Sequence, residues 1–248
     1  MVEALTVTII AVNEADRIGS AIRSASFADE ILVVDSGSTD DTVAIARSLG
    51  ARVIETDWPG YRVQKNRAAA WAQHDWVLGL DADEVVGEAL AESIQTVLNS
   101  PSAVGFEVDR LGHWMGAPIE YGTWRPDRSI RLFDRRHGEW AGGSVHERVR
   151  VTGAVGRLEG DLLHYPYRDL NEQLWTMQRY ALLFVQDAQA EGRSAWVTDV
   201  VFRPVFHLFK ALILKGGVRD GVRGLCLAGL GAASVMLKWG MLYLSDNE

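Results

Sequence analysis

The first hundred residues carry the pattern that most constrains the fold, because short apolar runs alternate there with segments of helical spacing. Such alternation is typical of parallel strands joined by right-handed helical crossovers. The sequence therefore predicts an α/β fold that is Rossmann-like, with a mostly parallel sheet and flanking helices. The four predicted strands cover residues 5–11, 30–35, 51–55 and 76–80.

Two predicted helix starts depend on single capping residues. Asn13 is predicted to cap a helix after the first strand, because Asn side chains accept hydrogen bonds from the N–H groups of a first turn. Asp169-Leu-Asn-Glu172 has the form of a capping box and predicts a helix that runs to about residue 191.

The pattern changes after Pro101. Strands are expected at 103–109, 129–134 and 157–165, with another at or before Val145-His146-Glu147. The rest of the chain has helical spacing. We therefore expect a sheet domain over residues 1–168 and C-terminal amphipathic helices over residues 169–248.

Acidic residues follow the predicted strands at the place where an open α/β sheet binds its ligand, beyond the carboxyl ends of the strands. Asp35 ends the second strand, and Asp81 and Asp83 follow the fourth. Two carboxylates of this kind suit Mg²⁺ or Mn²⁺ together with substrate phosphates. The alternative is a solvated turn, since short Asp-x-Asp strings also occur by chance.

The chain lacks the signature motifs of several common classes of protein. No Gly-x-Gly-x-x-Gly string follows the first strand, which argues against a nicotinamide or flavin enzyme, and no Walker A string occurs. Cys226 is the only cysteine, so an internal disulfide is excluded. A nucleotidyltransferase and a non-catalytic membrane-surface scaffold remain as alternatives to the enzyme described next.

Three strings near the predicted strand ends carry a resemblance to a known family: Thr8-Ile-Ile-Ala-Val-Asn-Glu14, Ile31-Leu-Val-Val-Asp35-Ser-Gly-Ser-Thr-Asp40-Asp41-Thr42 and Gly79-Leu-Asp81-Ala-Asp83-Glu84. In order and spacing they resemble glycosyltransferase family 2, which has the GT-A fold. The continuation through Gln64-Lys65-Asn66, Val145-His146-Glu147 and Phe202-Arg203-Pro204 resembles bacterial lipopolysaccharide core-type transferases, which add glucose to an inner-core heptose.

The resemblance implies a UDP-sugar donor and a nucleoside pocket at the ends of the first two strands. Asp35 would hydrogen-bond the uracil or ribose, and Asn13 and Glu14 would complete the pocket. Ser38 and Asp40 stand in the same loop as Asp35.

The resemblance also implies a divalent ion, Mg²⁺ or Mn²⁺, that bridges the two phosphates. Asp83 would bind this ion, while Asp81 would lie near the ribose and a metal-bound water. His164 matches the family's late metal-binding histidine, although a packed, hydrogen-bonded histidine is the alternative. Lys65 would offset diphosphate charge, unless it is a solvated lysine on an exposed helix face.

Glu147 is the predicted general base. An inverting transfer needs a carboxylate that accepts the acceptor hydroxyl's proton as the hydroxyl attacks the anomeric carbon. The string His146-Glu147 stands where related enzymes carry this acid. The alternative is a strand-end glutamate that pairs with Arg148 or Arg150.

Aromatic and basic residues of the second half are candidates for acceptor binding, because aromatic rings stack on sugars and guanidinium groups bind phosphate or carboxylate. A subset of them is expected to serve this role, and the others to be packed or paired with local acids. The candidates are Trp114, Tyr121, Trp124, Trp140, Arg125, Arg128, Arg131, Arg135 and Arg136.

Charge is distributed unevenly along the chain, whose formal net charge is −8. Residues 200–244 contain six basic residues and one acid, a net charge of +5, so the remainder carries −13. The acidic body argues against nucleic acid as a partner, while the basic, apolar tail suits an anionic membrane surface.

Residues 225–244 contain one charge, Lys238, and are long enough as a helix to span a bilayer. Three interpretations stand: in-plane association with a membrane, a true span, and a soluble bundle or oligomer interface. The N-terminal Met1-Val-Glu-Ala lacks the basic region of a secretory signal. We expect a cytoplasmic protein, peripheral at the inner face of the cytoplasmic membrane, that acts on a lipid-linked glycan.

Overall fold

The computed structural model describes residues 2–142 and 147–246. The chain forms two compact units, the first made of Met1–Arg110 and Asp127–His164 and the second of Leu111–Pro126 and Tyr165–Glu248. The second unit thus begins near the predicted boundary after residue 168. It also takes in Leu111–Pro126, which the sequence pattern had placed in the first domain.

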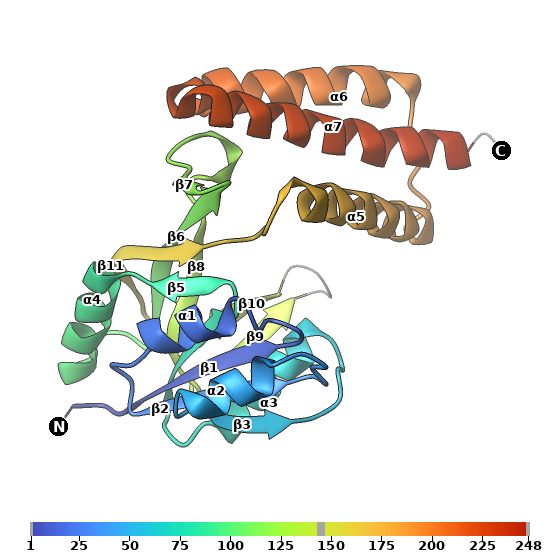
Figure 1. Cartoon of the computed structure of the whole chain (residues 1–248). Coiled ribbons are helices and arrows are strands. Elements are labelled where there is room, and N and C mark those ends of the chain that lie inside the picture. The colour runs from blue at the N-terminus through green and yellow to red at the C-terminus, as the bar shows by residue number, and fades with distance from the viewer. Residues whose placement is uncertain (1, 143–146, 247–248) are drawn as a thin grey trace. The chain divides into compact units, whose positions relative to one another are not determined.

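The first unit is built on a mixed sheet whose N-terminal half is parallel, in the order β3-β2-β1-β4. Strands β1, β2 and β3 are labelled in Figure 1. All seven residues of β1 are buried, as expected for a central parallel strand that is covered on both faces. The four predicted strands are confirmed. Their bounds are β1 (Leu5–Ala11), β2 (Glu30–Asp35), β3 (Arg52–Glu55) and β4 (Trp76–Asp81).

Further strands extend the sheet from β4, in the order β4-β8-β6-β11-β5, with antiparallel pairing of β4 with β8, β8 with β6, and β11 with β5. Three of them, β6, β8 and β11, confirm the strands expected at 103–109, 129–134 and 157–165, although β6 extends five residues further and β11 ends one residue sooner than predicted. The short strand β5 was not predicted. The bounds of these strands are β5 (Glu84–Val86), β6 (Gly105–Trp114), β8 (Arg128–Asp134) and β11 (Val155–His164). The α/β class predicted from the sequence is therefore confirmed.

A separate two-stranded ribbon forms from β9 (Gly138–Gly142) and β10 (Glu147–Val151). Glu147, the predicted base, is the first residue of β10 and pairs with Gly142. Val145 and His146 lie outside the described residues.

Helices of the first unit pack apolar side chains against the sheet, where Ile18 and Ile22 of α1 and Leu90 and Ile94 of α4 join the core. The prediction that Asn13 caps the first helix is wrong. That helix starts after Arg17, and no side chain caps it. The helices are α1 (Ile18–Ser24), α2 (Thr42–Ser48), α3 (Tyr61–Trp71) and α4 (Glu88–Asn99).

The second unit is mainly helical, with α7 packed against both α5 and α6 (Figure 1). The predicted cap of α5 is confirmed, because Asp169 Oδ1 accepts a hydrogen bond of 2.8 Å from Glu172 N. In a capping box the Glu172 carboxylate would also accept a hydrogen bond from Asp169 N. Here that carboxylate accepts from Arg168 N instead. The long helices are α5 (Leu170–Ala190), α6 (Val197–Phe209) and α7 (Gly221–Ser245).

Short elements complete the second unit. A π-helical turn, η2 (Lys210–Leu214), continues α6, and a 3₁₀ turn, η3 (Gly217–Asp220), leads into α7. Upstream, β7 (Ala117–Pro118) pairs with the end of β6, and η1 (Gly122–Trp124) follows it. Within the described part of the chain, Gly217–Ser245 is the one helical stretch whose length and composition suffice to cross a membrane.

Candidate active site

Side chains predicted to bind the nucleoside gather in two loops, one after β1 and the other after β2. Asp35, at the end of β2, is completely buried, and its Oδ1 accepts hydrogen bonds from Gly37 N at 2.9 Å and Ser38 N at 2.8 Å. Its Oδ2 accepts from the Ser38 hydroxyl. Asp35 therefore shapes its own loop.

The two loops are joined by side chains of the predicted pocket. Asn13 has a positive φ of 55°, which Asn tolerates better than most residues, and its Oδ1 accepts a hydrogen bond of 2.8 Å from Thr39 N. Asn13 N donates in turn to Ser38 Oγ at 2.9 Å. Asn13 thus links the loops instead of capping α1.

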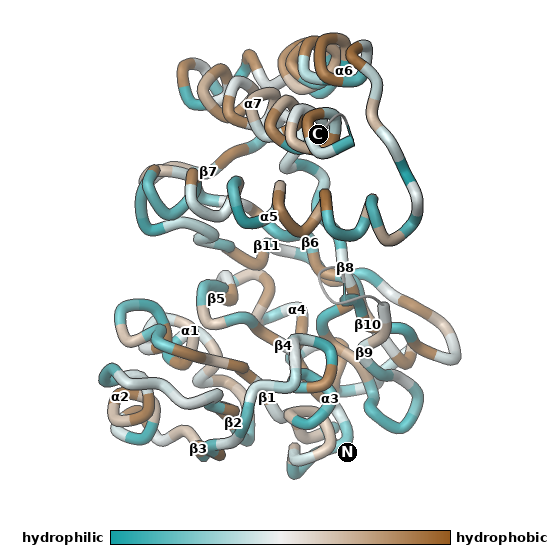
Figure 2. The backbone as a smooth tube through the Cα atoms, turned by 90° about the vertical axis from the view of Figure 1, so that its right-hand side faces the viewer, coloured by the Kyte–Doolittle hydropathy of each residue, from teal (hydrophilic) through white to brown (hydrophobic). Residues whose placement is uncertain are grey.

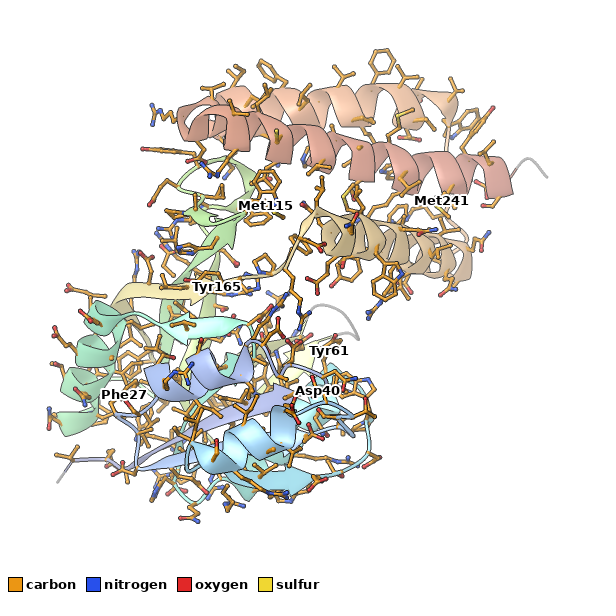
Figure 3. The ribbon with its side chains drawn as sticks, in the orientation of Figure 1. Phe27, Asp40, Tyr61, Met115, Tyr165 and Met241 are labelled. Carbon is orange, nitrogen blue, oxygen red and sulfur yellow. The ribbon has the colours of Figure 1, made fainter. Side chains whose placement is uncertain are left out.

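Asp40 makes a second link between the same loops (Figure 3). Its Oδ2 accepts from Ala15 N at 3.2 Å, and its Oδ1 accepts from Thr42 N at 3.0 Å. Hydrogen bonds from Thr42 lower the pKa of the Asp40 carboxyl, so this exposed group stays ionised. Glu14 N donates to Thr42 Oγ1 at 2.8 Å. The structure therefore brings the five predicted pocket residues together, and their binding of a nucleoside stays a prediction.

Asp81, the last residue of β4, lies between two cations. Its Oδ1 is 2.8 Å from Lys65 Nζ, and its Oδ2 is 3.2 Å from Arg131 Nη2. Burial raises the pKa of the Asp81 carboxyl, but the charges of Lys65 and Arg131 outweigh burial and hold the pKa well below its usual range. Asp81 is therefore a carboxylate whose charge the chain itself balances.

Glu84 is a site residue to which the sequence analysis gave no role. Its side chain is completely buried, and its Oε2 accepts a 2.9 Å hydrogen bond from Asp81 N. Its Oε1 lies 2.7 Å from Arg131 Nη2 and 2.8 Å from Arg110 Nε. Glu84 thus fixes both the backbone of Asp81 and the guanidinium that neutralises it. The sequence signal for this role was the position of Glu84, three residues after Asp81.

Lys65, on α3, connects Asp81 to the predicted base. Its Nζ lies 2.9 Å from Glu147 Oε1, and the residue is only 6% exposed. The ammonium also lies 4.5 Å from the centroid of the Trp140 ring, within the range of a cation–π interaction. The alternative of a solvated lysine is therefore wrong, while the role of Lys65 in offsetting diphosphate charge stays a prediction.

Asn66, the next residue of α3, anchors the ribbon that carries Glu147. Asn66 Nδ2 donates to Trp140 O at 2.8 Å, and Trp140 N donates to Asn66 Oδ1 at 2.9 Å. This two-way link ties α3 to β9, the partner strand of β10. These backbone contacts therefore help to hold Lys65 and Glu147 at a fixed distance from each other.

Asp83 and His164 form a second group beside this network. His164 stands opposite Glu84 in the pairing of β11 with β5, and its Nε2 lies 3.4 Å from Asp83 Oδ2. Arg17 Nη1 is 3.9 Å from the same carboxylate oxygen. Sheet pairing thus brings together two residues far apart in sequence that had been predicted as metal ligands.

One carboxylate and one imidazole suit Mg²⁺ or Mn²⁺ when phosphate oxygens and water supply the other ligands. Over residues 2–142 and 147–246, no group of three or more His, Cys, Asp or Glu side chains is arranged to hold a metal ion. Both Asp81 oxygens face cations. The predicted ligands that lie together are therefore Asp83 and His164, and metal binding by Asp81 stays a prediction.

Burial excludes three of the candidates for acceptor binding. Trp140 is 4% exposed and packs on Phe133, and Trp114 is 8% exposed and donates to Gln173 Oε1 at 2.8 Å. Arg131 is 4% exposed and serves Asp81 and Glu84. Other arginines have local partners: Arg128 pairs with Asp109, Arg135 with Asp75, and Arg136 with Asp134.

Comparison with known proteins identifies chains of similar sequence. The chain is 30% identical over 247 residues to the lipopolysaccharide core biosynthesis glycosyltransferase LpsC of Rhizobium meliloti (strain 1021), covering 96% of this chain and 92% of that protein. It is 47% identical over 233 residues to an uncharacterized glycosyltransferase of Rickettsia felis (strain ATCC VR-1525 / URRWXCal2), covering 86% of this chain and 80% of that protein.

Similarity to solved structures is more limited. The glucosyl-3-phosphoglycerate synthase of Mycobacterium tuberculosis, solved with Mn²⁺, UDP and glucosyl-3-phosphoglycerate, is 28% identical with a TM-score of 0.39. The match covers 45% of this chain and 44% of the synthase, which is less than half of that protein. A family model described as Glycosyl transferase family 2 matches residues 6–144, more than half of the chain. The chain therefore belongs to glycosyl transferase family 2.

Proposed function

We propose that this glycosyltransferase moves a hexose, glucose, from a UDP-sugar to a lipid-linked glycan with inversion at the anomeric carbon, and that the acceptor is the lipopolysaccharide inner core. Family membership supports the class of reaction. The 30% identity to a lipopolysaccharide core biosynthesis glycosyltransferase, over nearly the whole of both chains, supports the acceptor.

One observation carries the proposal: Lys65 Nζ lies within 3 Å of both Asp81 and Glu147, at 2.8 and 2.9 Å. Asp81 ends a central parallel strand, where open α/β sheets bind their ligands. Glu147 enters from a separate ribbon. A donor bound over the strand ends therefore has a partly exposed carboxylate near its sugar.

Glu147 acts as general base in this proposal. Its carboxylate accepts the proton of the acceptor hydroxyl while the hydroxyl oxygen forms a bond to the anomeric carbon. The bond from that carbon to the diphosphate oxygen breaks on the opposite face, and its electron pair leaves with UDP. Lys65 holds the carboxylate in position, which lowers the entropic part of the barrier.

Asp83 and His164 would hold the divalent ion, Mg²⁺ or Mn²⁺. When bound, such an ion supplies positive charge to the diphosphate leaving group. Glu84 and Arg131 keep the adjacent Asp81 fixed, so the chain around Asp83 has a defined geometry. The loops that contain Asn13, Asp35 and Asp40 would receive the uridine.

The enzyme works at the inner face of the cytoplasmic membrane in this proposal, because a lipid-linked acceptor is confined to the bilayer. The basic, apolar composition of the C-terminal helices supports such a location. Donor and enzyme would meet on the cytoplasmic side.

The proposal is tested by incubating purified protein with a panel of nucleotide sugars and Mn²⁺ or Mg²⁺, with and without truncated lipopolysaccharide core. We expect UDP release that depends on the acceptor and is greatest with UDP-glucose. Release from a different donor would change the assigned sugar. Absence of release with every donor would overturn the proposal in favour of a non-catalytic scaffold, and pyrophosphate release from nucleoside triphosphates would favour a nucleotidyltransferase.

A further inference from the structure

The polarity of α6 is the reverse of that of a helix on a water-soluble protein. A surface helix normally turns its apolar stripe inward and its polar side chains outward. On α6 most solvent-facing side chains are apolar, and five adjacent ones have exposed fractions of 50–67%. We call this set the outer face: Val201, Phe202, Val205, Phe206 and Phe209.

The inward side of α6 is less apolar than the outer face. Pro204 is buried there, and His207 Nε2 is buried without a hydrogen-bond partner among the described residues. Figure 3 shows carbon-rich side chains that project from α6 on the side away from α7. In Figure 2, hydrophobic segments occur along both α6 and α7. An apolar surface of this kind is not expected to face water permanently, because large exposed apolar patches mark interaction sites.

Exposed basic side chains occur on α6 itself, at Arg203, directly after it, at Lys210, and in the following turns. Residues 197–225 contain five basic residues and two acids, and both acids have partners. Asp199 Oδ1 lies 2.7 Å from Arg203 Nε, and Asp220 accepts from Tyr121 N at 3.0 Å. The uncompensated charge is therefore positive. The exposed cations are Arg203, Lys210, Lys215, Arg219 and Arg223.

The chemistry of the outer face favours lipid over protein as its occupant. Its five side chains offer no hydrogen-bonding group, whereas protein interfaces carry roughly one hydrogen bond per 100–200 Å². Apolar side chains accompanied in the chain by exposed cations match acyl chains below anionic headgroups. With 13 residues, α6 is about 20 Å long, which is less than a hydrocarbon core of roughly 30 Å. Its continuation η2 adds five residues, but the combined stretch carries three charged side chains, Asp199, Arg203 and Lys210, which disfavour a span.

We infer that the outer face of α6 inserts into the headgroup and upper acyl region of an anionic bilayer, with α6 lying in the membrane plane. Because α7 packs along α6, α7 is also held along the surface and does not cross it. The inference deepens the membrane location in the proposed function, and it concerns a surface distinct from the residues assigned to transfer.

Vesicle binding tests the insertion. Purified full-length protein is floated with vesicles of phosphatidylcholine alone or with 30% phosphatidylglycerol, at about 0.1 M and 1 M salt. We expect binding to the anionic vesicles that weakens at high salt. Phe202→Asp and Phe206→Asp should each weaken binding by about tenfold or more, because each removes an aromatic side chain that inserts into the bilayer and adds a charge that anionic lipid repels. Leu182→Asp on α5, where Leu182 is 46% exposed, is the matched control and should bind like wild type.

Depth measurements separate the in-plane arrangement from a span. Cys226 is the only cysteine and is exposed, so Cys226→Ser gives a background for single labels at Val201, Val205 and Phe209. Labels at successive turns should all be quenched at the same shallow depth by nitroxide lipids. A steady increase in depth from one label to the next would overturn the in-plane geometry.

Two further outcomes would overturn the inference. The first is vesicle binding that Phe202→Asp and Phe206→Asp leave unchanged. The second is a dimer in light scattering that these variants convert to monomer without affecting lipid binding, which would make the outer face a self-association surface. Each variant is checked by thermal unfolding and by UDP release with a delipidated acceptor. Normal release with lost vesicle binding supports the inference, while absent release in wild type counts only against the proposed function.

Discussion

Lys65 and Glu147 form an ion pair of 2.9 Å between α3 and the first residue of β10, 82 residues apart in sequence. The same ammonium contacts Asp81 at 2.8 Å. One cation therefore fixes the distance between the carboxylate at the end of β4 and the proposed base. The activity should depend on this cation even though we assign it no proton transfer.

Lys65→Met should lower kcat by about 100-fold, because Glu147 loses the group that positions it and Asp81 loses one of its two cations. The free energy of unfolding should fall by about 1–3 kcal/mol, since the partners of the buried ammonium are partly exposed. Lys65→Arg should recover part of the activity. The measurements are UDP release at saturating donor and chemical denaturation. Wild-type kcat in Lys65→Met would exclude a positioning role.

Glu147→Gln should abolish transfer, with kcat reduced by at least about 1000-fold, because the amide does not accept the proton of the hydroxyl. The amide still accepts a hydrogen bond from Lys65, so the melting temperature should change little. Glu139→Gln, on the neighbouring strand β9, is the control and should retain activity. Substantial transfer by Glu147→Gln would assign the base to another residue.

Removal of divalent metal should stop transfer and weaken UDP binding, because Asp83 and His164 alone leave the diphosphate charge unbalanced. We expect EDTA to abolish the thermal stabilisation by UDP and Mn²⁺ to restore it. His164→Ala should raise the Mn²⁺ concentration needed by about tenfold or more, and Asp83→Ala should prevent rescue at any concentration tested. Equal stabilisation of wild type and Asp83→Ala by UDP with Mn²⁺ would contradict this assignment.

Glu30 should make the fold sensitive to acid. Burial raises the pKa of its carboxyl, but hydrogen bonds from Gln73 N, Thr6 and Arg52, with the Arg52 charge, outweigh burial and lower the pKa overall. A lowered folded-state pKa stabilises the protein above the unfolded pKa, and this stabilisation is lost as pH falls through the folded value.

Glu30→Gln should therefore destabilise the protein by about 1–3 kcal/mol at pH 7. The difference from wild type should narrow as pH falls below about 4, where the wild-type carboxyl takes up a proton. Urea denaturation at a series of pH values measures both quantities. A difference that stays constant from pH 7 to pH 3 would show that ionisation of Glu30 does not contribute.

The strands were predictable because each apolar run directly reports burial, as in β1, where all seven residues are buried. The gathering of Asp35, Asp81 and Asp83 at strand ends was predictable for the same reason. The partners of Lys65 were not, because they come from β4 and from a ribbon whose position the sequence does not encode locally.

Asn13 shows a different limit of sequence analysis. A cap and a bridge between loops use the same side-chain oxygen, and the choice depends on Thr39, which lies 26 residues away. Arg131 and Trp140 were candidates for acceptor binding because the sequence does not show that their segments fold inward. Arg131 is buried by its ion pairs with Glu84 and Asp81, and Trp140 by packing on Phe133.

The hydrogen bonds that join the two loops also affect how a ligand would be received. Asn13 and Asp40 fasten the loop after β1 to the loop after β2 through Thr39 and Ala15. Folding has therefore already restricted the conformational freedom of both loops. A nucleoside that binds there would meet loops that are already ordered, so the entropic cost of binding should be small. Selectivity among bases should then depend on how well each base fits the existing surface of the loops.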